Sequence, residues 1–214
     1  VEKPVAETSA QIKKIKNKFS KLNIPLSVNY SRRFDAVARQ VWSDIKNKKY
    51  GNVISAVGLY NKGLIHAGSH LLDLAGLFFG RVSSGKTLHK IYDHSKSDPS
   101  VSAWLKFTHC PNFFLIAGDS RAYEIFEMEI LLEKARLKFF NAGQELSVEL
   151  RVKDKLCPEF TVLGKPVIKK TELARCAYGL IQNAVDFLDK KAELYCALDD
   201  ALKAQAICEK LILN

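Results

Sequence analysis

Two histidines and an aspartate lie close together in the segment IHAGSHLLD. His66 and His70 are four residues apart and Asp73 follows three residues later, so on a helix they share nearly one side. Such a set can ligate zinc or iron, or it can anchor a helix in the core through hydrogen bonds. Alternatively, His70 alone can exchange a proton, because the ordinary histidine pKa of about 6.5 suits acid–base work near neutrality. The remaining histidines show no such spacing: His89, His94 and His109.

A second candidate is the segment Gly80–Thr87, which matches the phosphate-binding pattern G-x-x-x-x-G-K-[ST] at every position. That loop binds phosphate only between a strand and a helix, where backbone N–H groups and the helix N-terminus converge on the anion. Here a predicted helix precedes the segment, and Leu88–Tyr92 after it reads as extended. We therefore predict a helix-to-strand turn. A P-loop nucleotide hydrolase using Lys86 stays as a competing hypothesis.

Two lysines complete the candidate residues. Lys3 stands in the tripeptide Glu2-Lys3-Pro4, and Lys62 stands between a predicted strand and a predicted helix. An ammonium group lowers the pKa of a neighbouring hydroxyl and orients it, and Lys62 is a candidate contact for a sugar or a phosphate. A three-residue motif has little meaning alone, so the interpretation of Lys3 depends on the order of the other motifs.

The overall composition excludes several classes of protein. The chain has 214 residues, 47% of them hydrophobic and 26% charged, which is typical of a globular domain with a real core. No apolar run approaches the roughly 18 residues of a membrane span, and the first residues do not resemble a secretory signal. The five cysteines are widely spaced without a C-x-x-C pair, which indicates reduced thiols and a cytoplasmic location.

The formal net charge of +10 raises the question of nucleic-acid binding. The densest basic stretch runs from Lys13 to Lys21. Apolar residues recur through it at helical spacing (Ile12, Ile15, Phe19), so the lysines occupy the solvent side of a helix. No arginine stripe or aromatic platform accompanies them, and we expect no nucleic-acid partner.

The first part of the chain is mostly helical by its periodicity. Thr8 and Gln11 form a capping box for a helix that runs to about Leu22. Alternating apolar and polar residues then predict a strand, and later segments show helical spacing with glycine just past the end. The predicted elements are a strand at Ile24–Tyr30, a helix at Phe34–Lys48, a strand at Asn52–Tyr60 and a helix at Ile65–Phe79.

From about Leu88 the pattern changes to strands joined by short turns. Parallel strands need crossovers of a dozen or more residues, so these strands must be mainly antiparallel. We predict an α+β fold in which helices pack on one face of a large, mostly antiparallel open sheet. The later elements are strands at Ala103–Thr108, Phe113–Ala117, Tyr123–Leu132, Ala135–Phe140 and Glu145–Val152, then helices at Ala174–Lys190 and Leu198–Leu211.

Taken together, these motifs resemble the Gfo/Idh/MocA family of glucose–fructose oxidoreductases and inositol dehydrogenases. Glu2-Lys3-Pro4 is similar to the E-K-P motif that ends a strand of the family's Rossmann domain. The segment NYSRRF at Asn29–Phe34 resembles the crossover out of that domain, and GSHLLDL at Gly68–Leu74 resembles the helix with the catalytic histidine. Asp186-Phe187 and the pair Asp199-Asp200 resemble the family's C-terminal helices, so the resemblance covers essentially the whole chain.

The resemblance implies hydride transfer between NAD or NADP and a CH–OH carbon of a sugar, polyol or nucleotide sugar. By position, Lys3 would contact both the substrate hydroxyl and the nicotinamide ribose, and His70 would handle the hydroxyl proton. Arg32 and Asp73 would line the substrate pocket. His66 stands where many members have an aspartate, and a second histidine would repel rather than hold a charge on His70.

The resemblance also implies a domain boundary. Residues 1–30 would be the last helix and strand of a Rossmann domain that is otherwise missing, and residues 31–214 would be the C-terminal substrate-binding and oligomerisation domain. The glycine-rich turn of a dinucleotide fold is not in the sequence. We therefore expect this fragment alone to bind no cofactor and to be inactive, and we expect a homo-oligomer formed through the large sheet.

Three other functions stay open beside this oxidoreductase. The first is a cofactor-free sugar-binding or assembly module without catalysis. The second is the P-loop hydrolase, and the third is a small metalloprotein that uses His66, His70 and Asp73. The sequence does not name the substrate or choose between NAD and NADP.

Overall fold

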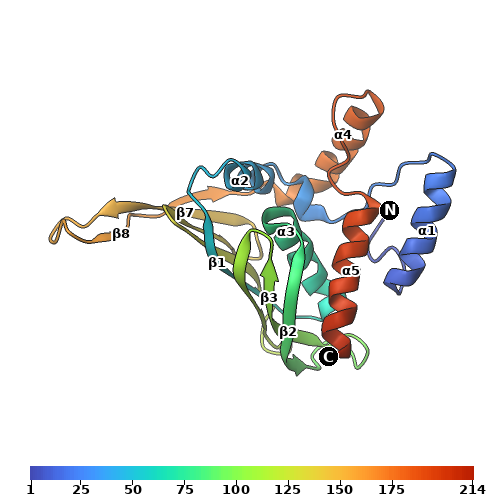
Figure 1. Cartoon of the computed structure of the whole chain (residues 1–214), viewed down its shortest axis with the longest axis horizontal. Coiled ribbons are helices and arrows are strands. Elements are labelled where there is room, and N and C mark those ends of the chain that lie inside the picture. The colour runs from blue at the N-terminus through green and yellow to red at the C-terminus, as the bar shows by residue number, and fades with distance from the viewer.

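A nine-stranded sheet with helices on one side forms the body of the computed structural model, which describes all 214 residues (Figure 1). Its strand order is β2-β3-β4-β1-β5-β6-β7-β8, with β9 also paired to β7. The strands are β1 (Val53–Tyr60), β2 (Val82–Ile91), β3 (Ser100–Phe107), β4 (Cys110–Ala117), β5 (Phe126–Leu132), β6 (Ala135–Phe140), β7 (Glu145–Lys153), β8 (Thr161–Leu163) and β9 (Val167–Lys170).

Five α-helices and three short helical turns complete the chain. None of the helices is long and apolar enough to cross a membrane. The α-helices are α1 (Ser9–Lys21), α2 (Ala36–Lys46), α3 (Ser69–Phe79), α4 (Cys176–Leu188) and α5 (Leu198–Leu213), and the turns are η1 (Ser31–Phe34), η2 (Leu64–Gly68) and η3 (Leu173–Arg175).

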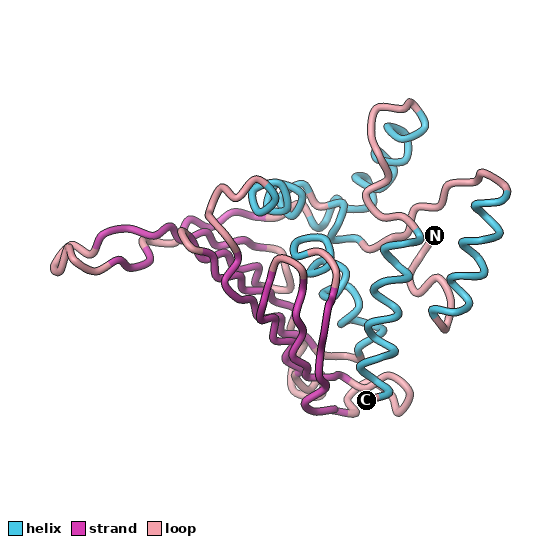
Figure 2. The backbone as a smooth tube through the Cα atoms, in the orientation of Figure 1, coloured by secondary structure: helices cyan, strands magenta, loops and turns pink.

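The sheet confirms the predicted α+β class. All its strand pairs are antiparallel except the central pair of β1 and β4. Period-2 alternation decides which residues enter the core: in β4, Phe113 and Leu115 are buried, whereas Phe114 and Ile116 between them are exposed. Helices α3 and α5 cover the inner face (Figure 2), and their apolar residues join those of the strands in one core cluster of 29 buried residues.

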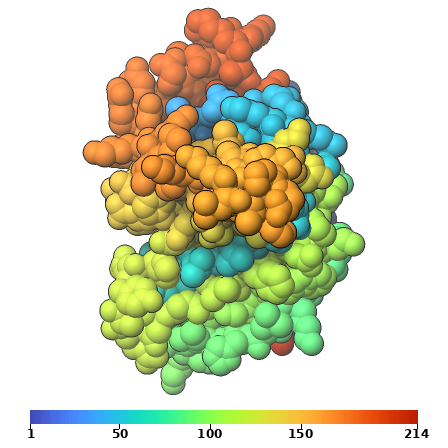
Figure 3. Space-filling view, turned by 90° about the vertical axis from the view of Figure 1, so that its left-hand side faces the viewer, coloured from blue at the N-terminus to red at the C-terminus, as the bar shows by residue number.

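The outer face of the sheet has no cover and keeps large apolar side chains in solvent. Figure 3 looks toward this side of the molecule, with the orange arm formed by the end of β7 and by β8 standing in front of the strands. The arm carries Leu156, which is 93% exposed, and Phe160. The exposed apolar residues of the strands include Ile54, Phe114, Ile116, Leu131 and Leu150.

The segment Gly80–Thr87 leads from a helix into a strand, as predicted, but the turn is only Gly80 and Arg81, and β2 already includes the remaining residues. Gly80 ends α3 with a φ of +83°, a conformation that favours glycine, and β2 begins at Val82. Lys86 therefore lies within a strand, paired with Trp104 of β3. The order helix, glycine, strand does not present converging N–H groups to a phosphate, so the P-loop hypothesis is wrong.

One predicted strand is absent, and two short strands of the structure were not predicted. Helix α1 has the predicted capping box of Thr8 and Gln11, but Ile24–Tyr30 is no strand. The segment has no strand beside it along its length and makes only two isolated bridges, Glu2 with Asn29 and Ser27 with Ala197. β8 and β9 were not predicted, because all their residues are exposed and their burial does not alternate.

A buried ion pair fixes the turn η1 against helix α3. Arg33 Nε donates to Asp73 Oδ2 over 2.7 Å, and both residues are almost fully buried. Arg33 Nη1 donates to the Tyr195 carbonyl over 3.0 Å and lies 3.5 Å from Asp200 Oδ2. One guanidinium therefore connects η1, α3 and the start of α5.

We predict that Arg33→Met lowers the free energy of unfolding by about 3–5 kcal/mol, because it leaves the Asp73 carboxylate buried without its partner. Urea unfolding measures the change. Arg136→Met is the control: Arg136 pairs with Glu149 on the surface, and such pairs contribute about 0–1 kcal/mol. Equal losses for the two variants would contradict a structural role for the buried pair.

Candidate active site

The site is built around the wide turn that leads into α3. Residues Leu64–Gly68 form a π-helix, a rare conformation that often occurs at functional sites. The Asp98 carboxylate holds the turn open at its start, accepting from the backbone N–H of Ile65 (2.7 Å) and of His66 (2.9 Å). The turn places His66 at the surface and starts the helix that carries His70.

Lys3 reaches this turn from the beginning of the chain. Its ammonium donates to the carbonyl of His66, although 63 residues separate the two. The first residues are held in place by Asn29 Nδ2, which donates to Glu2 Oε1 over 2.8 Å, and by the Val1 amine, which donates to the Ser27 carbonyl. Burial lowers the pKa of Lys3 from its ordinary value, against the opposing effect of Asp98.

His70 lies in a half-buried and positively charged environment. Burial lowers its pKa to about 3, and the charges of Lys3, Arg32 and His66 act in the same direction. Its ring meets Tyr30 edge-on at 5.4 Å, and Nδ1 is buried without a hydrogen-bond partner. His70 is therefore neutral at neutral pH.

Arg32 supplies the second permanent positive charge near His70. Its guanidinium lies 3.5 Å from the centroid of the Phe126 ring, and Nη2 donates a long hydrogen bond of 3.4 Å to the Ala142 carbonyl. Burial lowers the pKa of Arg32 to about 10, so it stays charged. Its Nε is buried without a partner. The cation–π contact directs Arg32 toward the sheet, while its neighbour Arg33 turns to Asp73.

Around the rim the structure adds residues that spacing did not reveal. The His66 ring stacks on His94 at 4.7 Å, and Lys62 Nζ pairs with Glu124 Oε1 at 2.5 Å. Burial lowers the pKa of His66, helped by the charges of Lys3, His94 and Lys62. His94 and Glu124 come from loops after β2 and before β5. No local pattern in the sequence marks either residue, because only the fold brings these loops together.

Asp73 lies apart from this group. Its side chain takes part in the buried ion pair with Arg33, and it is not among the charges that act on His70. No group of three His, Cys, Asp or Glu side chains in the structure is arranged to hold a metal ion, so His66, His70 and Asp73 do not form the metal site considered above. The structure thus brings together Lys3, Arg32, Lys62, His66 and His70.

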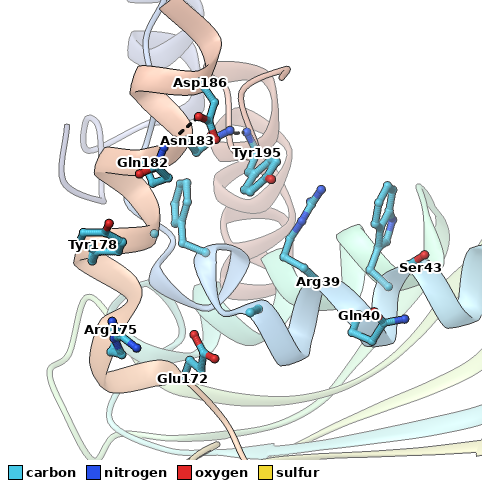
Figure 4. Close-up of a pocket in the computed structure, with 14 residues that line it drawn as sticks. Arg39, Gln40, Ser43, Glu172, Arg175, Tyr178, Gln182, Asn183, Asp186 and Tyr195 are labelled. Carbon is cyan, nitrogen blue, oxygen red and sulfur yellow. Dashed lines mark hydrogen bonds between the residues drawn. The ribbon is translucent and has the colours of Figure 1, made fainter. Parts of the chain in front are cut away.

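A large cavity is at a different place. It has a volume of about 590 Å³ and lies between α2 and α4 (Figure 4). Arg39 stands in it with its guanidinium over the rings of Tyr195 (3.8 Å) and Trp42 (4.6 Å). None of the candidate residues lines this cavity. We therefore assign the candidate active site by the chemistry around His70 and not by cavity size.

Comparison with known proteins supports the fold only. No family model and no curated protein sequence matches the chain. Among solved structures, an oxidoreductase from Agrobacterium radiobacter in complex with NAD+, L-tartaric acid and magnesium has a TM-score of 0.71 at 15% identity. The UDP-N-acetylglucosamine 3-dehydrogenase GnnA from Acidithiobacillus ferrooxidans has a TM-score of 0.72 at 11% identity. A super-repressor mutant of Gal80p from Saccharomyces cerevisiae has a TM-score of 0.79 at 12% identity.

These alignments cover nearly the whole chain but not the whole of the neighbours. The alignment with the Agrobacterium oxidoreductase includes 100% of this chain and 70% of the neighbour. The alignment with GnnA includes 99% and 68%, and the alignment with Gal80p includes 99% and 69%. The matched part contains the large, mostly antiparallel sheet and the helices on its inner face. The resemblance seen in the sequence is thus confirmed for the fold: the chain has the fold of the C-terminal domain of Gfo/Idh/MocA-type oxidoreductases.

Proposed function

We propose that this chain supplies the catalytic residues of an NAD- or NADP-dependent oxidoreductase that acts on a CH–OH group of a sugar, polyol or nucleotide sugar. The observation that carries the proposal is the position of Lys3: it donates to the His66 carbonyl one turn before His70, and its charge lowers the pKa of the half-buried His70. Two neighbours of the same fold support it by their printed activities, one with bound NAD+ and one a nucleotide-sugar dehydrogenase.

The arrangement suits the oxidation of an alcohol. The reaction removes a proton from the hydroxyl while a hydride leaves its carbon. The Lys3 ammonium would lower the pKa of the hydroxyl and stabilise the developing alkoxide. His70, held neutral by burial and by neighbouring cations, would accept the proton at a ring nitrogen. Arg32 and Lys62 are the proposed contacts for the remaining oxygens of the substrate.

We propose a nicotinamide cofactor at the reacting end of this site. When bound, it supplies the acceptor for the hydride. Lys3 is the residue that would lie beside its nicotinamide ribose, and the orphaned His70 Nδ1 shows that the polar groups here are not satisfied within the chain. The nucleotide part would be held by residues outside the 214 described.

His66 bears on the protonation state that we propose for His70. The family resemblance places an aspartate at this position in many members, where it would favour a protonated catalytic histidine. Here His66 acts in the opposite direction and lowers the pKa of His70. The proposed resting state is therefore a neutral base, which is the form needed to oxidise an alcohol rather than to reduce a ketone.

A non-catalytic binding or assembly module is the second candidate, and one observation favours it. The neighbour Gal80p is described as a repressor mutant, so the same fold occurs in a protein described by a regulatory role.

The uncovered apolar outer face also suits association, and we propose that copies of the chain pair through it. The free cysteines agree with the proposed cytoplasmic location.

We predict that Lys3→Met and His70→Asn each lower kcat for reduction of NAD+ or NADP+ by roughly 10²–10⁴-fold, the usual effect of losing a group that assists proton transfer. Because these 214 residues contain no dinucleotide-binding turn, the assay uses them within the full-length protein, with a panel of polyols, sugars and nucleotide sugars. Lys86→Met, a change on an exposed strand position, is the control and should keep full activity. No turnover with the whole panel would favour the non-catalytic candidate, and full activity of Lys3→Met would overturn the role proposed for Lys3.

We also predict that His70 stays neutral in the folded protein between about pH 8 and about pH 5, because its pKa lies near 3 whereas an unfolded histidine titrates at about 6.5. A proton NMR titration of the imidazole C–H signals measures the pKa of His70 directly. Lys3→Met should move the midpoint upward, since it removes a positive neighbour. A midpoint of about 6.5 in the unaltered protein would show that the site is not buried in this way.

The lowered pKa of His70 also makes the free energy of unfolding depend on pH. The folded pKa is depressed, so the unfolded state binds the extra proton below about pH 6.5 and the native state loses stability as the pH falls from there toward 3. The expected slope for this one group is at most about 1.4 kcal/mol per pH unit. His70→Gln should flatten the urea-unfolding profile over that range, and His66→Gln should flatten it less.

A further inference from the structure

A second cavity, separate from the candidate active site, lies beside helix α3. Its volume is about 410 Å³, and its walls come from the middle of α3 and the glycine that ends it, the beginning of β2 and the first half of α5. Cavities of this size accommodate small organic ligands. None of Lys3, Arg32, His66 and His70 lines it. What the cavity binds can therefore be argued independently of the proposed oxidoreductase.

Three basic side chains and two carboxylates line the cavity, and both carboxylates are already paired within the chain. Asp73 Oδ2 accepts from Arg33 Nε over 2.7 Å. Asp200 lies between two cations, with Oδ2 at 3.5 Å from Arg33 Nη1 and Oδ1 at 3.7 Å from Lys203 Nζ. Since these four charges balance one another, the carboxylates leave no free negative charge for a cationic ligand.

The charge that remains is the guanidinium of Arg81, at the mouth of the cavity. Its side chain is exposed, and the acceptor that Arg81 provides to Thr108 is its backbone carbonyl. Lys203 also stands at the mouth, where its side chain is 59% exposed and its contact with Asp200 is long. A guanidinium presents a planar set of donors that matches a carboxylate. The mouth therefore favours an anionic group.

A glycine opens the wall of the cavity as far as the backbone of α3. Gly76 stands inside the helix, where glycine is less favourable than any residue except proline. Crowding explains another glycine of the core, Gly58, because a Cβ there would overlap the Leu71 side chain. A Cβ on Gly76, in contrast, would meet no atom within 4 Å. Packing within the chain does not require a glycine at this position, but a molecule lying against the helix would.

The rest of the lining is aliphatic. Side chains from three elements contribute to it: Leu72, Val82, Ala204 and Ile207. No hydroxyl, amide or aromatic side chain lines the cavity. A sugar would therefore find few partners for its hydroxyl groups, and a planar aromatic ligand would find no ring to stack on. Such walls favour a saturated hydrocarbon chain, which gains free energy by leaving water.

We propose that this cavity binds a small aliphatic carboxylate, the anion of a saturated fatty acid. The hydrocarbon chain lies over Gly76 and along the aliphatic walls, and the carboxylate faces Arg81 and Lys203 at the mouth. The ligand's polarity follows from the lining, which has balanced charges, apolar walls and one unpaired guanidinium. Asp73 and Arg33 stay paired with each other and take no part in binding.

Isothermal titration calorimetry with octanoate tests the proposal. Butanoate, which has a shorter chain, and octan-1-ol, which has no charge, are the comparison probes. We expect octanoate to bind more tightly than either, with affinity rising from butanoate by up to roughly fourfold per added methylene. Arg81→Met should weaken octanoate binding roughly two- to fivefold, the effect of one exposed charge pair, and leave octan-1-ol unchanged.

A matched pair of lysines on α5 gives a further control. Lys203→Met should also weaken octanoate binding, whereas Lys210→Met, an exposed change on the same helix outside the cavity, should not. Equal affinity for octanoate and octan-1-ol would overturn the proposed recognition of an anion at the mouth.

Gly76→Leu is the decisive variant, because its side chain enters the cavity where a Cβ meets no atom, and leucine favours the helix. It should abolish octanoate binding while the urea-unfolding midpoint is not lowered. Ala177→Leu, a change of similar kind on the exposed side of α4, should keep the binding. Lys3→Met should also keep it, which separates this site from the proposed oxidoreductase site. Absence of binding by the unaltered protein, or binding that survives Gly76→Leu, would overturn the proposal.

Discussion

The ion pair of Arg33 and Asp73 is the constraint on which the arrangement of the chain depends. Both partners are nearly inaccessible to solvent, so neither charge can be left alone without a large loss of free energy. The pair joins η1 to α3 and, through Tyr195 and Asp200, to the C-terminal part. Because Arg33 faces α3, the preceding Arg32 turns toward the sheet and stacks on Phe126. One contact thus decides the direction of two consecutive arginines.

The candidate active site uses this frame to collect positive charge in a place with little solvent. The positive charges of Lys3 and Arg32 act on His70 together with its burial, and they favour the uncharged form of His70. The same site also contains the clearest unmet hydrogen-bonding capacity, at His70 Nδ1 and Arg32 Nε. Charge that is uncompensated within a chain is a feature of sites that receive a polar ligand, and it costs stability that the ion pair and the core must offset.

Helix α3 separates two environments. Its first turn, widened by the π-helix, presents His66 and His70 to the cationic site, and further along the helix Asp73 turns to Arg33. The 3.6-residue period explains how one short helix does this, since residues three and six positions after His70 turn progressively to another face.

The sequence by itself determined the elements that depend on local patterns. The alternation of Phe113 with Phe114, the capping box of Thr8 and Gln11 and the glycine after α3 each act through near neighbours, so the α+β class, the antiparallel sheet and the helix carrying His70 were predictable. The motif order also pointed to Lys3 and His70. Tertiary structure alone decided that Ile24–Tyr30 finds no strand to pair with, that His94 stacks on His66 and that Asp73 belongs to Arg33. These contacts join residues far apart in the chain, and no local periodicity encodes which distant partner a side chain will meet.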